Sequence, residues 1–169
     1  GLASLRDYCS WLFDGDNLEG ETEHLLNAVT TNKTDFFREP KHFDYLMATV
    51  LPGLRAAGAK RLRVWSSACS TGAEPYTLAM LLDSYAADHG GPDYGILATD
   101  LDSDVLKVAR RGVYPAAMLD PVPPALRARY ALKAIDPKRN EMRIAPELRA
   151  AVGFARMNLM DARYPVPWR

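Results

Sequence analysis

Hydrophobic positions change their period along the chain, and these changes divide it into predicted helices and strands. Apolar residues recur at helical spacing in several early segments: residues 2–13, 21–29 and 41–50. A short apolar run at 62–65 then predicts a buried strand, and helical spacing returns over 73–84. A second strand at 94–100 and a helix capped by Asp102 or Ser103 repeat the same order.

Strand, helix, strand, helix is the order of a parallel sheet with right-handed crossovers. The pattern changes at Tyr114, after which prolines mark a loop and short strands follow: residues 130–135, 141–144 and 152–157, with a turn at 136–140. We expect residues 114–157 to form a small antiparallel excursion from the main sheet. This leaves only a short parallel sheet with an unpaired edge, so either the chain is truncated or a partner supplies the rest of the sheet; we expect truncation.

Composition restricts the function only weakly. The chain carries 21 Lys and Arg against 21 Asp and Glu, so its global charge gives no case for nucleic acid or membrane binding. No apolar run approaches the roughly 20 residues that span a bilayer. Two cysteines and three scattered histidines form neither a disulfide framework nor a metal pattern. We expect a cytoplasmic protein without a metal site.

The stretch between the first strand and its helix consists of small residues, from Ser66 to Gly72. Small side chains let the backbone approach a ligand at a helix N-terminus, as in nucleotide-binding α/β units. An ordinary connection between strand and helix is the alternative. A single Gly72 argues against a dinucleotide, and the absence of a following Gly-Lys-Ser/Thr excludes a P-loop.

Two acidic residues restrict the class of ligand that this turn could bind. Asp100 ends the second strand, where an acid binds ribose hydroxyls in doubly wound units; a helix N-cap is the structural alternative. Glu74 opens the helix after the turn, where it either complements the helix dipole or faces a ligand. A carboxylate there repels a phosphate and favours a cation. S-adenosylmethionine, which has an adenosine and a sulfonium but no phosphate, fits best.

A further candidate segment is TTNKTDFFREP at residues 30–40. It combines polar groups on Asn32 and Thr34 with two phenylalanines and a charged Arg38. That mixture favours a ligand-contacting linker. The alternative is a solvated loop whose phenylalanines belong to the core.

Three blocks together resemble a known family: TTNKTDFFREPKHF, SSACSTGAEPYTLAM and ATDLDSDVLKVARRGVY. They are similar, in order and spacing, to the chemoreceptor glutamate methyltransferases of bacterial chemotaxis (the CheR type). The resemblance implies a doubly wound, Rossmann-like methyltransferase domain that uses S-adenosylmethionine and yields S-adenosylhomocysteine. It also implies a helical N-terminal segment over residues 1–50, a methyltransferase part over 51–169, and a small antiparallel β-subdomain near 114–157.

The resemblance also implies the site. Cofactor contacts would fall on Asn32, Thr34, Arg38, Glu74, Asp100, Asn158 and Leu159. Arg38 would also be the catalytic residue, near the reacting centre or the cofactor's carboxylate. The implied partners are the cytoplasmic domains of chemoreceptors, with no nucleic acid and no membrane insertion.

Other functions stay open at this point. The chain could bind the cofactor as a non-catalytic sensor or adaptor, or it could methylate a different acceptor. A nicotinamide-dependent oxidoreductase is a weaker alternative, because the turn has one glycine and carries Glu74.

Overall fold

The computed structural model describes three stretches of the chain: residues 3–14, 17–136 and 138–164. Pro137 of the predicted turn and the final residues 165–169 lie outside them. The chain divides into two compact units, Gly1–Thr31 and Asn32–Arg169. Among the helices of the described stretches, none is both long enough and apolar enough to cross a membrane.

The first unit is a pair of helices, α1 (Leu5–Asp14) and α2 (Leu18–Val29). Tyr8 on α1 donates a hydrogen bond to Glu21 Oε1 on α2 at 3.1 Å. Leu12 is the buried residue of α1. Both helices predicted from the apolar spacing are confirmed, although α1 begins later and α2 earlier than expected.

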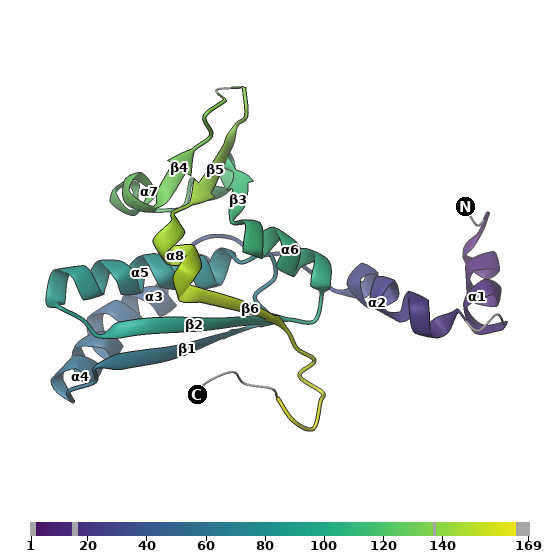
Figure 1. The fold of residues 1–169 in the computed structure, drawn as a ribbon, viewed down its shortest axis with the longest axis horizontal. Helices are drawn as coiled ribbons and strands as arrows, with labels where there is room; N and C mark the ends of the chain where they lie inside the picture. Colours follow the sequence, from purple (N-terminus) through teal and green to yellow (C-terminus); the bar gives the residue numbers. More distant parts are fainter. Residues whose placement is uncertain (1–2, 15–16, 137, 165–169) are drawn as a thin grey trace. The chain divides into compact units, whose positions relative to one another are not determined.

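The second unit is built on a parallel sheet with the strand order β1-β2-β6. Its strands are β1 (Arg61–Ser67), β2 (Asp93–Asp100) and β6 (Val152–Arg156). Helix α5 (Ala73–His89) connects β1 to β2, and α6 (Ser103–Arg111) follows β2. Figure 1 shows α5 and α6 on the same side of this sheet, as right-handed crossovers in one direction require.

β2 is the central strand because its residues are apolar on both faces. Ile96, Leu97 and Ala98 are all buried, whereas β1 alternates between exposed and more buried positions. The sequence of a strand covered on both faces is a continuous apolar run, whereas the sequence of a strand with one exposed face alternates between apolar and polar residues. The two strands pair in register from Arg61 opposite Asp93 to Ser67 opposite Thr99.

The third strand corrects a prediction. Residues 152–157 are predicted in the antiparallel excursion, but β6 pairs in parallel with β2, with Ile96 opposite Val152 and Asp100 opposite Arg156. The prediction is wrong because the strand is too short for its period to reveal its partner. A short helix, α8 (Pro146–Ala151), which the sequence did not suggest, turns the chain back toward the sheet.

A continuous helical run precedes the sheet: α3 (Pro40–Tyr45), η1 (Leu46–Val50) and α4 (Leu51–Ala56). The helix predicted over residues 41–50 ends before Pro52, yet the observed run continues through this proline. Pro52 has no N–H to donate, and the preceding turn is wider than an α-turn, with the Leu51 N–H bonded to the Leu46 carbonyl. Such a wide turn accommodates a proline without ending the helix.

The antiparallel excursion is real but shorter than predicted. It contains β3 (Val113–Pro115), β5 (Glu141–Ile144) and β4 (Ala131–Lys133), paired in that order. A short helical turn, η2 (Ala116–Leu119), and α7 (Pro124–Tyr130) lie between β3 and β4. The predicted strands near 131 and 141 are therefore confirmed, and β3 is an addition.

A polar clamp joins this β-subdomain to the parallel part. Tyr130 at the end of α7 donates a hydrogen bond to Asp83 Oδ2 of α5 at 2.7 Å, and Arg129 approaches the same oxygen at 3.4 Å. The Tyr130 ring itself is completely buried in the core. The clamp fixes the β-subdomain against α5.

Candidate functional site

The carboxyl ends of the parallel strands gather most of the predicted site residues at one edge of the sheet. β1 ends at Ser67, β2 at Asp100 and β6 at Arg156. Glu74 and Asn158 follow β1 and β6 after short connections. This edge is where open parallel α/β sheets bind ligands.

The turn after β1 has an unusual backbone. Ala68, Ser70 and Gly72 all have positive φ, at 56°, 49° and 92°. Two of them are not glycine, and each such residue costs on the order of 1–3 kcal/mol unless its surroundings hold it. The N–H groups of the turn have different partners: Cys69 donates to the Thr99 carbonyl at 2.9 Å and Gly72 to the Cys69 carbonyl at 3.0 Å, whereas Ser70 donates to a carboxylate.

Asp100 supplies the anion that this turn binds. Its Oδ2 accepts the Ser70 N–H at 2.7 Å, and its Oδ1 accepts the Asp102 N–H at 3.0 Å. Asp100 is buried, at 8% exposure. Each carboxylate oxygen has a further lone pair, so Asp100 can hold the turn and still accept a hydroxyl hydrogen bond.

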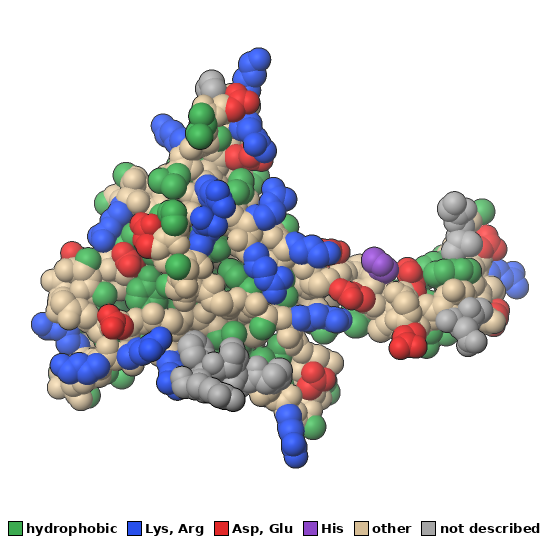
Figure 2. All heavy atoms as spheres, viewed as in Figure 1, with side chains coloured by type: hydrophobic (Ala, Val, Ile, Leu, Met, Phe, Trp, Pro, Cys, Tyr) green, Lys and Arg blue, Asp and Glu red, His purple; other side chains and the backbone are tan. Residues whose placement is uncertain are grey.

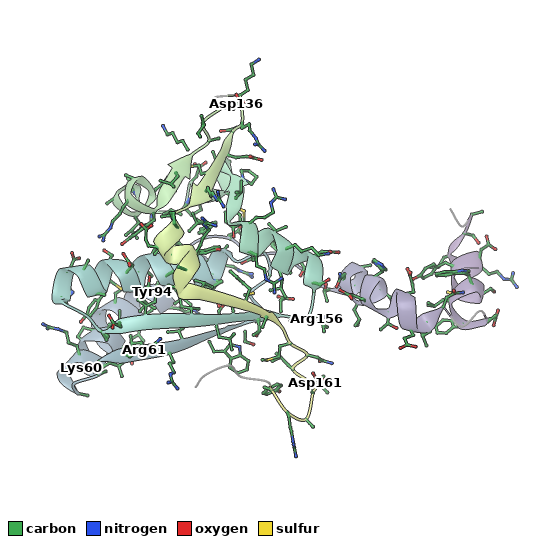
Figure 3. The ribbon with its side chains drawn as sticks, viewed as in Figure 1. Lys60, Arg61, Tyr94, Asp136, Arg156 and Asp161 are labelled. Atoms are coloured by element: carbon green, nitrogen blue, oxygen red, sulfur yellow. The ribbon has the colours of Figure 1, made fainter. Side chains whose placement is uncertain are left out.

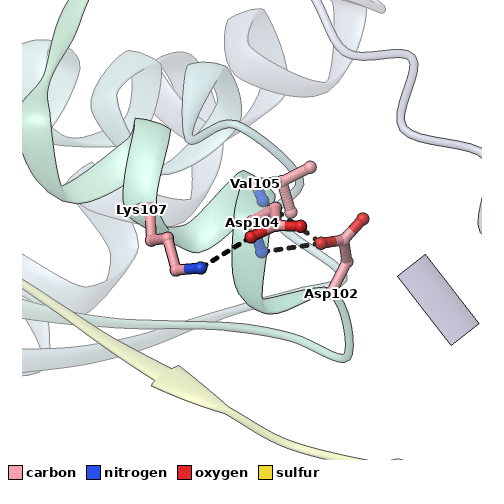
Figure 4. A network of polar contacts seen from close by, with 4 residues as sticks. All are labelled: Asp102, Asp104, Val105 and Lys107. Atoms are coloured by element: carbon pink, nitrogen blue, oxygen red, sulfur yellow. Dashed lines mark hydrogen bonds and ion pairs between the residues drawn. The ribbon is translucent and has the colours of Figure 1, made fainter. Parts of the chain in front are cut away.

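The helix N-cap that the sequence offered as the alternative role of Asp100 belongs to Asp102. Asp102 Oδ1 accepts the N–H groups of Asp104 at 2.8 Å and Val105 at 3.2 Å, which caps α6 (Figure 4). Lys107 pairs with Asp104 at 2.7 Å one turn further on. Asp100 is therefore not the cap of α6, and its carboxylate can bind the turn and a ligand.

The linker enters the site at Asn32. Its side-chain Nδ2 donates to Asp102 Oδ2 at 2.7 Å, and its backbone carbonyl accepts the Ser70 hydroxyl at 2.9 Å. Asn32, Ser70, Asp100 and Asp102 thus form one hydrogen-bonded network. The linker and the ends of β1 and β2 therefore meet at this network.

Of the two phenylalanines of the linker, Phe36 belongs to the core and Phe37 is partly buried against it. Phe36 is 1% exposed and packs edge-on against Tyr114, with ring centroids 5.2 Å apart. The Phe37 N–H donates to Thr77 Oγ1 of α5 at 3.2 Å. These contacts anchor the linker, which is how an otherwise polar segment keeps a fixed position beside the turn.

Glu74 stands in the first turn of α5 and is exposed. Its Oε1 accepts a hydrogen bond from the buried Ser66 hydroxyl at 2.7 Å, so the carboxylate is oriented although it faces solvent. An oriented, exposed carboxylate at this edge can receive a cationic group of a ligand.

Arg38 and Thr34 are not joined to this network. Arg38 is exposed, and its Nη1 donates to the Lys33 carbonyl at 3.2 Å. Within the described stretches, no hydrogen bond or ion pair connects Arg38 to Glu74 or Asp100. Thr34 is half-buried in the linker. Their predicted roles in binding and catalysis stay predictions.

The segment after β6 approaches the site through Met157, whose N–H donates to the Asp100 carbonyl at 2.9 Å. The next residue, Asn158, turns the chain, since its Oδ1 accepts the Met160 N–H at 3.0 Å. The Leu159 side chain is 48% exposed, and its carbonyl accepts the Tyr164 hydroxyl at 2.6 Å. Asn158 and Leu159 therefore border the same edge as Asp100.

Sequence reasoning missed the residues that hold the site in place. In the sequence, Ser66 and Ser70 stand out only as small residues, and Asp102 only as a cap. The signal that could have identified these three residues was their type, since each has a hydroxyl or a carboxylate in or near a turn of small residues. The partners, eight to seventy positions away, could not be assigned from spacing.

Cys69, in the middle of the turn, is expected to be unreactive as a nucleophile. It is 1% exposed, and burial raises the pKa of its thiol to about 12, with the nearby Asp100 carboxylate acting in the same direction. A protonated, buried thiol is a poor nucleophile. Within the described stretches, no cluster of three or more His, Cys, Asp or Glu side chains could hold a metal ion.

The fold and this edge define a class of protein: a doubly wound domain whose ligand turn carries carboxylates. Asp100 is buried and accepts one backbone N–H on each carboxylate oxygen, and Glu74 is exposed and accepts the Ser66 hydroxyl. A phosphate would meet two negative charges here. An adenosine with a positively charged tail and no phosphate fits the donors and acceptors present.

The chain belongs to the CheR methyltransferase family. The family model described as "CheR methyltransferase, SAM binding domain" matches residues 32–168. The chain is 38% identical to chemotaxis protein methyltransferase 2 of Pseudomonas aeruginosa over 98% of its own length and 57% of that protein. It is 36% identical to the chemotaxis protein methyltransferase of Escherichia coli, covering 99% of this chain and 56% of that protein. It therefore spans about half the length of these curated relatives.

Proposed function

We propose that the protein containing this chain transfers a methyl group from S-adenosylmethionine to glutamate side chains of bacterial chemoreceptors. The observation that carries the proposal is the match to the CheR SAM-binding domain, which includes the carboxyl edge of the sheet with Asp100 and Glu74. The names of the relatives in Pseudomonas aeruginosa and Escherichia coli support the link to chemotaxis. The methylated glutamates lie on the cytoplasmic side of the receptors in this proposal, which places the protein in the cytoplasm.

The proposed cofactor contacts follow the network of the edge. Asp100 accepts the ribose hydroxyls with the lone pairs that Ser70 and Asp102 leave free. Glu74, oriented by Ser66, receives the cofactor's ammonium group. Asn32 and Thr34 border the cofactor from the linker. Asn158 and Leu159 border the adenine, since they follow Met157, which is bonded to the Asp100 carbonyl.

The bound cofactor supplies an electrophilic methyl group, whose C–S bond breaks as the C–O bond to the acceptor forms and whose electron pair remains on sulfur. A glutamate acceptor is already ionised near neutral pH, so the protein needs no strong base. Its task is to position the carboxylate in line and to exclude water. Arg38 orients a carboxylate through its guanidinium, which can bind both oxygens.

Two measurements test the proposal in sequence. S-adenosylhomocysteine must raise the melting temperature of the protein, since a ligand of the native state alone stabilises it. A radiolabelled methyl group must then pass from S-adenosylmethionine to a receptor cytoplasmic fragment and be released as methanol by mild base, as a carboxyl ester requires. Stabilisation without transfer favours a sensor or adaptor, and label that resists base favours another acceptor group.

Arg38→Ala is the variant that tests the catalytic assignment. We expect transfer to be abolished while the fold is kept, because Arg38 is exposed and its hydrogen bond goes only to the neighbouring Lys33 carbonyl. Arg61→Ala, at the opposite edge of the sheet in Figure 3, is the matched control and should keep full activity. Wild-type methylation by Arg38→Ala would remove Arg38 from the site.

A further inference from the structure

Arginines gather on one surface of the second unit although the whole chain is neutral. Blue side chains are frequent in Figure 2 over α6 and the elements next to it. We call the following set the arginine face: Arg110 and Arg111 of α6, Arg143 of β5, Arg149 of α8 and Arg156 of β6. All are exposed except the half-buried Arg149.

Contacts between the elements place these residues on one continuous surface. Arg110 Nη2 of α6 donates to the Phe154 carbonyl of β6 at 3.1 Å. Arg156 Nε, two residues further along β6, donates to the Leu101 carbonyl just before α6 at 3.0 Å. The α6 helix and the β6 strand therefore hold their arginines side by side.

The same surface continues into the β-subdomain. A Cβ built on Gly112, directly after α6, would lie 2.9 Å from the Arg149 Cδ. Val113, the next residue, pairs with Arg143 of β5. Positive field from Arg149 and Arg143 reaches the buried Tyr76 phenol, where it partly opposes the rise in pKa that burial causes. The face thus runs from β6 across α6 to β5.

Within the described stretches, no acid forms an ion pair with the arginine face. The ion pairs found there involve other cations, namely Lys107, Arg127, Arg129 and Arg139. Cations on a protein surface are usually paired or dispersed, because like charges repel. A group of cations without paired acids raises the local concentration of an anionic partner and speeds its association.

Several of these arginines are also held in position. Arg110, Arg149 and Arg156 each donate one hydrogen bond to a backbone carbonyl. A guanidinium has five N–H groups, so most of its donors stay available. Because the side chains are already ordered, less conformational entropy is lost when they bind carboxylates.

We propose that the arginine face binds an acidic segment of the acceptor protein beside the glutamate that is methylated. The inference rests on the proposed function. Its geometric support is that Arg156 pairs in register with Asp100, so the face begins at the edge that holds the site. An acceptor bound along α6 would present its carboxylates to the arginines and its reactive glutamate at that edge.

Acidic protein fits this surface better than nucleic acid. Proteins that bind single-stranded nucleic acid combine cations with aromatic side chains on which the bases stack. The exposed large aromatic side chains of the described second unit are Tyr45, Trp65 and Tyr164, and none belongs to α6, α8, β5 or β6. A group of guanidinium ions without exposed aromatic side chains beside it is suited to binding carboxylates.

The test uses Arg111→Glu/Arg143→Glu in the full-length protein. The side chains of these arginines make no hydrogen bond or ion pair within the described stretches, so the exchange changes charge without removing such a contact. The control is Arg55→Glu/Lys60→Glu, which changes the net charge equally at the amino edge of the sheet, where Figure 3 labels Lys60.

We expect the KM for the receptor fragment to rise by about tenfold in Arg111→Glu/Arg143→Glu and to depend less on salt, as loss of charge complementarity requires. The dissociation constant for S-adenosylhomocysteine and the control's KM should stay at the wild-type value. Should the double variant fold poorly, Arg111→Gln/Arg143→Gln must shift KM in the same direction by a smaller factor.

An unchanged KM in the correctly folded variants would overturn the inference. Single-stranded RNA that inhibits the wild-type protein more strongly than poly-glutamate, at equal charge, would also overturn it. Absence of transfer by the wild-type protein is a different result, because it overturns the proposed function and this inference together.

Discussion

At the scale of single residues, the Asp100 carboxylate has two tasks. It accepts the Ser70 and Asp102 N–H groups, and thereby stabilises a turn in which Ala68 and Ser70 hold positive φ. It also supplies, in our proposal, the acceptor for the ribose. A substitution at this position therefore affects stability as well as binding, and the two effects must be measured separately.

Asp100→Ala should lower the free energy of unfolding by about 2–4 kcal/mol, because it leaves two backbone N–H groups without an acceptor in a buried site. It should also weaken binding of S-adenosylhomocysteine. Urea denaturation measures the first effect, and calorimetry at a temperature where the variant is folded measures the second. Asp88→Ala, an exposed acid at the end of α5, is the control and should leave both quantities unchanged. Wild-type stability of Asp100→Ala would contradict the role of the carboxylate in the turn.

Ser66 acts on the ligand through Glu74. Removing its hydroxyl in Ser66→Ala frees the Glu74 carboxylate, and one hydrogen bond to a charged group is worth about 1.5–3 kcal/mol at most. We expect weaker binding of S-adenosylhomocysteine but unchanged binding of methylthioadenosine, which lacks the amino-acid group. The neighbouring exposed residue provides the control, Ser67→Ala. Equal loss for both ligands would mean that Ser66 supports the turn and not the carboxylate.

At the scale of elements, Gly72 decides how closely the turn packs against α6. Its φ is 92°, and a Cβ at this position would lie 2.9 Å from the Ala109 Cβ and 3.0 Å from the Tyr114 hydroxyl. Both the conformation and the close approach therefore require glycine. The single glycine of the turn thus has a packing role, whereas the sequence interpretation considered it only as a ligand contact.

Gly72→Ala should destabilise the protein by about 1–3 kcal/mol through backbone strain and the clash with α6. Gly53→Ala should have the opposite sign. Gly53 lies inside α4, a Cβ added there would have no atom within 4 Å, and alanine in a helix is favoured by roughly 0.5–1 kcal/mol. Denaturant midpoints of the two variants test both statements. A stabilised Gly72→Ala variant would mean that the turn can relax away from α6.

At the scale of the whole molecule, the core contains weakly acidic groups that must stay neutral. Cys69 and Tyr76 are buried, and burial raises the pKa of each to about 12. Burial also raises the pKa of Tyr114, whose hydroxyl donates to the Thr71 carbonyl at 2.7 Å. In the unfolded chain these groups have their ordinary pKa values, 9.0 for cysteine and 10.0 for tyrosine.

Stability should therefore fall as the pH rises from about 9 to about 12, since the unfolded chain loses protons that the native protein still binds. The melting temperature measured at increasing pH tests this expectation. Tyr76→Phe should show a smaller decrease, because it has no phenol to ionise. Tyr45→Phe, which alters an exposed ring, should follow the wild-type curve. A melting temperature that stays constant over this range would contradict the expectation.

Much of the site could be predicted because the relevant signals are local. The strand, the small-residue turn and Glu74 occupy neighbouring positions, and Asp100 ends a strand that its apolar run made visible. The clustering of Asn32, Ser70 and Asp102 could not be predicted in the same way. It depends on which strands are adjacent and on how the linker is anchored by Phe36.

Periodicity, residue type and short-range spacing are properties of the chain alone, and they were enough for the α/β class, the carboxylate-bearing turn and the resemblance to the family. Three other features became visible only in three dimensions: β6 pairs with β2, the helix passes through Pro52, and the arginine face is continuous. Each of these depends on how segments pack and pair in the folded protein. The free energy of such contacts is set by packing, register and hydrogen bonding in space, and not by the order of residues along the chain.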